Sequence, residues 1–167
     1  MKFITIVFLM GMFLTVTSSY GGTTLPDFSQ YKVKETDTFT GQPKPVDLSS
    51  YKDAKTYRTK LREGTKEGPN FAGHYTIVSF GCGTQCQDNW VIDAKTGKII
   101  DRFASVIGSK YELKSALLII NPPDKEFKKA FEEHPEQPIL GTMDTIYRIL
   151  KDGIFEVVHT AKWVDIN

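Results

Sequence analysis

Short runs rich in β-branched and aromatic residues follow one another after Gly73, and each run ends at a turn signal. DAKTG (93–97) and KDG (151–153) are short enough to join neighbouring antiparallel strands, with Gly97 where a positive φ is needed. Sequential hairpins of this kind predict an antiparallel sheet, and the runs provide six or seven strands. The runs are HYTIVSF (74–80), NWVID (89–93), KIIDRF (98–103), YELKSALLIIN (111–121), TIYRIL (145–150) and IFEVVHTAKW (154–163).

Two further segments have helical spacing of apolar residues. The first is DLSSYKDAKTYRTKLREGTKEG (47–68), with Ser49 or Ser50 as the expected N-cap and a glycine at its end. The second is DKEFKKAFEEH (124–134), with Asp124 as its N-cap. The sequence therefore predicts one α+β domain, built from a single curved antiparallel sheet and two helices.

The N-terminus has the pattern of a signal peptide. Lys2 precedes an uncharged run of about fourteen residues, and small and polar residues follow it. A membrane span needs roughly 20 apolar residues, so we expect cleavage near Ser19 or Gly21 and no stable membrane insertion after processing. The expected divisions are a signal peptide (1–21), a polar arm (22–45) in which residues 31–39 could form an edge strand, and the α+β domain (46–167). The expected location is the periplasm or the exterior.

The charge of the chain excludes one class of partner. Its 21 basic and 20 acidic residues nearly cancel, and a net charge this close to zero gives no electrostatic footprint for nucleic acid or an anionic membrane. The partner we expect is a protein or an envelope polymer.

Cys82 and Cys86 are the only cysteines, four positions apart in a glycine-rich stretch. In an exported chain this spacing predicts a structural disulfide that closes a turn. Three other interpretations are weaker. A redox pair would have two intervening residues and a following helix, a structural zinc site would have a second ligand pair, and a thiol nucleophile would need His74 within reach although a strand separates them.

His74, Tyr75, Trp90 and Asp93 form the candidate functional surface. Each has a simpler structural interpretation: His74 as a hydrogen-bonding group, Asp93 as the cap of its turn, and the two aromatic residues as core and rim. The sequence contains no known hydrolase, phosphate-loop or dinucleotide motif. We therefore predict no catalytic residue, cofactor or metal.

GPNFAGHYTIVSFGCGTQC (68–86) and IDAKTGKI (92–99) resemble the core of a group of uncharacterised small exported bacterial proteins. That core has an F-x-G-H-Y strand, a W-G-C-G-x-x-C turn and a D-A-x-T-G hairpin. SALLIIN (115–121) and IYRILKDGIF (146–155) are similar to the group's later strand and closing hairpin. The chain departs from the group in having Phe80 in place of the tryptophan, and it lacks the extra cysteines of some members. The resemblance implies export and fold, and it transfers no catalytic residue.

Two functions follow from these observations. The first is an exported, non-catalytic binding or inhibitory module stabilised by one short-loop disulfide. The alternative is an envelope enzyme, a hydrolase or a thiol-disulfide enzyme, with a site near His74, Cys82, Cys86 and Asp93.

Overall fold

The computed structural model describes residues 24–84, 86–134 and 143–163. The predicted signal peptide (1–21) lies outside the described residues. No helix in the described part of the chain is long and apolar enough to cross a membrane.

In the described residues, seven strands form two antiparallel sheets, so the prediction of one curved sheet is wrong while the α+β class is confirmed. The first sheet has the order β1-β2-β3, and the second has the order β4-β5-β6-β7. The strands are β1 (Tyr75–Gly83), β2 (Cys86–Asp93), β3 (Ile99–Ser105), β4 (Ser109–Tyr111), β5 (Leu117–Ile120), β6 (Thr145–Lys151) and β7 (Ile154–Ala161).

The chain passes from the first sheet to the second between β3 and β4. Here the side chain of Asn121 accepts main-chain hydrogen bonds that a neighbouring strand would otherwise accept. The amide oxygen of Asn121 accepts hydrogen bonds from the main-chain N–H groups of Val106 (2.8 Å) and Ile107 (3.2 Å). Gly108 then turns the chain with a φ of 106°. Because these N–H groups are satisfied locally, the chain can leave the first sheet without exposing unpaired backbone.

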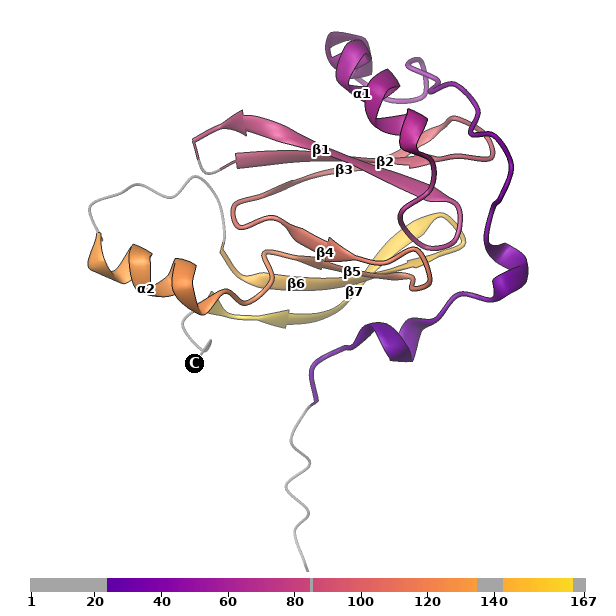
Figure 1. Ribbon diagram of the computed structural model, residues 1–167. Helices are drawn as coiled ribbons and strands as arrows, with labels where there is room; N and C mark the ends of the chain where they lie inside the picture. The colour runs from indigo at the N-terminus through magenta and orange to yellow at the C-terminus, as the bar shows by residue number, and fades with distance from the viewer. Residues whose placement is uncertain (1–23, 85, 135–142, 164–167) are drawn as a thin grey trace, which may run out of the picture.

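The molecule has three layers (Figure 1). One apolar core lies between the two sheets and includes Ile77 and Val91 from the first and Leu118 from the second. The other core lies between the outer face of the first sheet and α1, where Trp90 and Leu61 are fully buried. The part of the first sheet that lies under α1 is therefore buried on both faces, which requires apolar residues on consecutive positions there, as in the buried first half of β1.

The first helix is shorter than predicted. A 3₁₀ turn, η3 (Ala54–Tyr57), leads into α1 (Arg58–Gly64), and η4 (Thr65–Glu67) follows. Asp53 has a φ of 63°, which is incompatible with a helix, so neither predicted serine cap is used. Ser50 instead donates to the main-chain oxygen of Asp47 at 2.6 Å.

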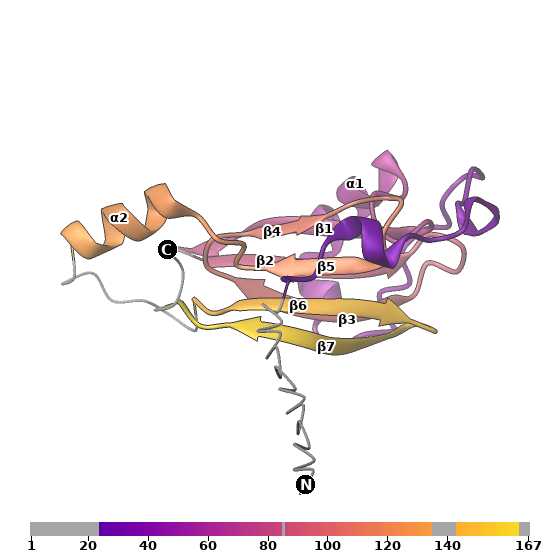
Figure 2. The same ribbon diagram turned by 90° about the horizontal axis from the view of Figure 1, so that it is seen from below.

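The second helix, α2 (Lys125–Glu133), begins as predicted. The carboxylate of its N-cap, Asp124, accepts from the N–H of Phe127 at 2.9 Å. This helix projects from one end of the two sheets in both views (Figures 1 and 2).

Residues 24–45, the expected polar arm, pack along the domain. The predicted strand within them is absent; two 3₁₀ turns, η1 (Phe28–Tyr31) and η2 (Glu35–Asp37), stand there instead. The segment is held by main-chain hydrogen bonds from Val33 to Lys114 (3.0 Å), from Phe39 to Gly73 (2.8 Å) and from Lys44 to Ala94 (2.9 Å). It therefore contributes side chains to the sites of the folded domain.

Candidate functional site

The two cysteines form the predicted disulfide at the tip of the β1–β2 hairpin. Cys82 and Cys86 are bonded, with their Cα atoms 5.2 Å apart, and β2 rather than a helix begins at Cys86. His74 lies at the other end of β1, about 26 Å away for eight residues of extended chain. The disulfide and the histidine are therefore not parts of one site.

A cavity of about 420 Å³ lies beside His74. Its lining includes the β6–β7 turn, and that turn lies at the end of the sheets opposite α2 (Figure 1). Residues from three separate parts of the chain line it. Asp37 comes from the N-terminal segment, Lys95 from the β2–β3 turn, and Asp152 from the β6–β7 turn. The remaining lining residues are Val33, Ala72, His74, Tyr75, Asp93, Ile100, Ala116, Leu150 and Gly153.

His74 is the most unusual polar group of this cavity. Its side chain is 20% exposed, its Nε2 is 4.0 Å from Oδ1 of Asp93, and its buried Nδ1 has no hydrogen-bond partner among the described residues. Burial lowers the pKa of His74, and the charge of Lys95 lowers it further, although Asp93 and Asp37 oppose the shift. The imidazole is consequently neutral at physiological pH, with one nitrogen able to accept a hydrogen bond.

Asp93 mainly stabilises its own turn, in agreement with its simpler interpretation. Its carboxylate accepts from the N–H of Lys95 and from the hydroxyl of Thr96, both at 2.8 Å. Gly97 closes the turn with a φ of 79° and donates to the main-chain oxygen of Asp93 at 2.7 Å. These bonds fix the carboxylate 4.0 Å from His74, which is too far for a hydrogen bond.

Comparison with protein-family models, curated proteins and solved structures finds no match to this chain. The function of the cavity has to be inferred from its own geometry.

The polar groups of the cavity favour a positively charged ligand. Three carboxylates, from Asp37, Asp93 and Asp152, line it together with the single cation of Lys95. Burial raises the pKa of Tyr75, as do the charges of Asp93 and Asp152, so its phenol remains a hydrogen-bond donor and acceptor. No group of three or more histidine, cysteine and acidic side chains in the described residues is arranged to hold a metal ion.

Trp90, the fourth predicted residue, does not reach this cavity. Its side chain is fully buried on the opposite face of the sheet, in the core against α1. Its indole N–H donates to Asp88 at 3.0 Å, and the guanidinium of Arg102 lies 4.5 Å from the Trp90 ring centroid. Arg102 also binds both carboxylate oxygens of Asp88, each at 2.8 Å. Trp90 and Asp88 are buried within the domain, so the indole ring is not available as a platform for a ligand.

Asp37, Lys95 and Asp152 are charged residues of the site that the sequence did not indicate. Asp37 lies in a segment taken for a polar arm, and Asp152 lies in a turn whose residues suit the turn itself. The sequence offered one signal for Asp152, its position in a hairpin turn. Hairpin turns at the same end of two packed sheets bring their side chains close together.

Proposed function

We propose that the protein is an exported binding module and that the cavity beside His74 is its ligand site. The observation that carries this proposal is the convergence of three chain segments on one cavity whose carboxylates outnumber its cations. A basic group of a protein or envelope polymer, such as an amine or a guanidinium, has the complementary charge. Leu150 and Ile100 would contact the aliphatic part that carries it.

Chemical groups of the cavity also support binding over catalysis. The cavity lining contains no serine, threonine or cysteine, and its tyrosine is held in the protonated form. Asp93, which would have to orient His74, is engaged by its own turn. A hydroxyl or thiol nucleophile, a base and an orienting group therefore do not coincide in this lining.

One observation favours the alternative, a hydrolase. His74 is a partly exposed, neutral histidine at the cavity, and a neutral imidazole can accept a proton from a water molecule. The cavity could then receive a substrate instead of a retained ligand.

Titration with small amines, followed by two-dimensional NMR, distinguishes these functions. Lysine and arginine amides should shift the signals of His74, Tyr75 and Lys95, whereas the N-acetylated lysine should not. Asp152→Asn should weaken the binding, and Asp53→Asn, the same change at an exposed position outside the cavity, should leave it unchanged. An absence of shifts would contradict the binding site. Turnover of ester or glycoside substrates that His74→Gln abolishes would establish the hydrolase.

A further inference from the structure

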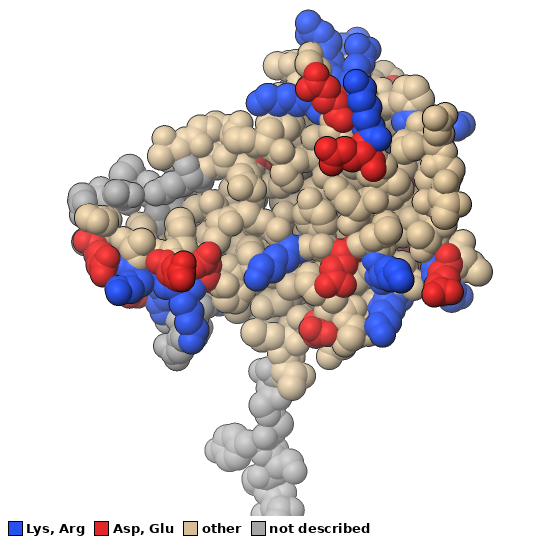
Figure 3. Space-filling view, viewed as in Figure 1, with Lys and Arg blue, Asp and Glu red and all other residues tan. Residues whose placement is uncertain are grey.

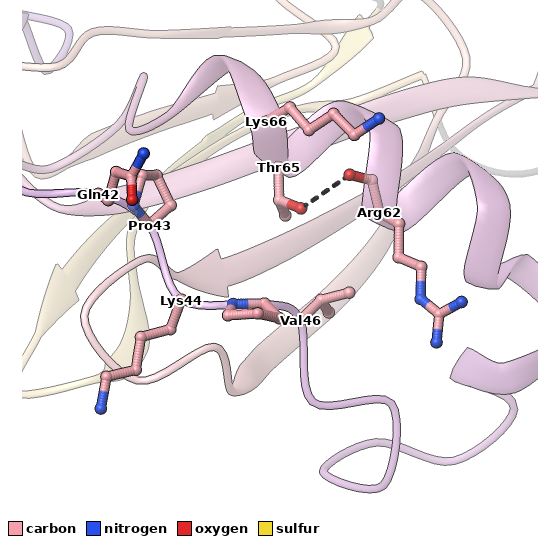
Figure 4. Close-up of a pocket in the computed structure, with 8 residues that line it drawn as sticks. Gln42, Pro43, Lys44, Val46, Arg62, Thr65 and Lys66 are labelled. Carbon is pink, nitrogen blue, oxygen red and sulfur yellow. Dashed lines mark hydrogen bonds between the residues drawn. The ribbon is translucent and has the colours of Figure 1, made fainter.

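A second cavity, of about 520 Å³, lies between the N-terminal segment and the end of α1 (Figure 4). One wall is the extended segment Gln42–Val46, and the other carries Arg62, Thr65 and Lys66. Figure 4 shows Lys44 and Arg62 on opposite walls. In Figure 3, Lys and Arg side chains gather over α1, with acidic side chains among them.

The charges that line this groove are all positive. Lys44, Arg62 and Lys66 are exposed, and the lining contains no acidic residue. None of the three forms an ion pair with another described residue, whereas Arg102 and Arg148 elsewhere each pair with an aspartate. An anionic ligand would therefore not have to displace an internal partner.

The surface between these cations is apolar and held in place. Pro43, Pro45 and Val46 provide it, and Val46 is buried against the domain. Main-chain hydrogen bonds to the β2–β3 turn fix both ends of the wall: Lys44 donates to Ala94 at 2.9 Å, and Asp47 donates to Gly97 at 2.8 Å. The groove is consequently formed before a ligand arrives, which lowers the entropic cost of binding.

The groove provides few groups that recognise a sugar. Gln42 and Thr65 are its only uncharged polar side chains, and the Thr65 hydroxyl already donates to the main-chain oxygen of Leu61 at 2.9 Å. A glycan, whose binding depends on many hydroxyl contacts, would leave the proline and valine surface unused. A peptide that interleaves carboxylates with apolar side chains would use both the cations and that surface.

We propose that this groove binds an acidic, partly apolar peptide segment of a partner protein. It is a site separate from the cavity beside His74, and it has the opposite charge preference.

Fluorescence anisotropy with a labelled peptide that alternates Glu and Val tests the proposal. The full processed chain should bind it, and the Gln-for-Glu and Lys-for-Glu peptides should bind at least about tenfold more weakly, as expected for the loss of several exposed charge pairs. Raising the salt concentration should also weaken binding, because exposed charges are screened. Equal binding of the Gln-for-Glu peptide would overturn the role of charge.

Two triple variants localise the effect. Changing Lys44, Arg62 and Lys66 to Glu should abolish binding, whereas changing the exposed Lys52, Lys55 and Lys110 to Glu alters the net charge equally and should reduce binding far less. Equal losses would mean general attraction and would overturn the groove. NMR shifts of the unaltered protein provide a readout that does not depend on the variants folding, and shifts outside 42–46 and 62–66 would contradict the site. Displacement of the peptide by a sulfated glycan at lower concentration than by unlabelled peptide would reassign the groove to a polyanion.

Discussion

Replacing Gly97 by alanine tests how the N-terminal segment is held against the domain. Gly97 has a φ of 79°, and a Cβ built on it would lie closer than 3.0 Å to the main-chain oxygen of Pro45. Two other glycines separate the contributions. Gly153 has a φ of 80° with nothing within 4 Å of the added atom, and Gly81 has neither a positive φ nor a neighbour.

The three alanine variants should differ in a defined order. Gly81→Ala should raise the free energy of unfolding by about 0.4–1 kcal/mol, because it only reduces the entropy of the unfolded chain. Gly153→Ala adds a left-handed alanine and should cost about 1 kcal/mol. Gly97→Ala adds the overlap with Pro45, which threatens the hydrogen bonds of Lys44 and Asp47 to the turn. Loss of each hydrogen bond costs about 0.5–1.5 kcal/mol, so Gly97→Ala should lower the free energy of unfolding by about 2–4 kcal/mol in all.

Urea unfolding followed by tryptophan fluorescence measures these differences, since Trp90 is fully buried in the folded state. The slope of the free energy against urea should be the same for all variants, so that the midpoints can be compared directly. If Gly97→Ala costs no more than Gly153→Ala, the close approach of Pro45 to the turn is wrong.

Three other predictions concern His74, the disulfide and the leader. Burial lowers the pKa of His74 in the folded protein below its ordinary value of 6.5, so the unfolded state binds more protons. The free energy of unfolding should therefore decrease as the pH is lowered below about 6.5. Urea unfolding at a series of pH values should show a smaller loss of stability for His74→Gln than for the unaltered protein. If the free energies of unfolding of the two proteins depend on pH in the same way, the role of His74 is wrong. Replacing both Cys82 and Cys86 by serine should cost about 1–3 kcal/mol and preserve the fold in circular dichroism, because the closed loop is short. Thiols that titrate without reductant in the denatured, unaltered protein would contradict the disulfide. The intact mass of the exported protein should lack the leader up to about Ser19 or Gly21; a full-length species in the inner membrane would refute processing.

Local elements of the fold could be predicted from the sequence, but the division into two sheets could not. Hairpins and the disulfide depend on residues close in the chain, such as Cys82 and Cys86. The division depends on the side chain of Asn121, which satisfies N–H groups fourteen and fifteen positions earlier. The sequence did indicate that β1 and β2 are covered on both faces, because each has consecutive apolar residues. It did not indicate where the chain leaves the first sheet.

Strand pairing brings together two of the residues that the sequence named as a candidate surface. Tyr75 and Asp93 are directly paired across β1 and β2, so their proximity follows from the hairpin. Trp90 is three positions from Asp93 in the same strand, and successive side chains of a strand alternate between its faces. Trp90 and Asp93 therefore lie on opposite faces of β2. This alternation could have been used to leave Trp90 out of the candidate surface. Asp37 and Asp152 required the tertiary fold, because no pairing rule connects them to β2.

The two candidate sites share the β2–β3 turn, and this gives the Gly97 variant a second consequence. Lys95 of the turn lines the cavity beside His74, while Ala94 and Gly97 hold the wall of the basic groove through their main-chain oxygens. An added Cβ at Gly97 points at Pro45, toward the groove wall. Gly97→Ala should therefore weaken binding of the acidic peptide more than binding of lysine amide, measured by the two titrations above on the same folded variant. Equal weakening of both would indicate that the whole turn has moved, and the local displacement of Pro45 would then be wrong.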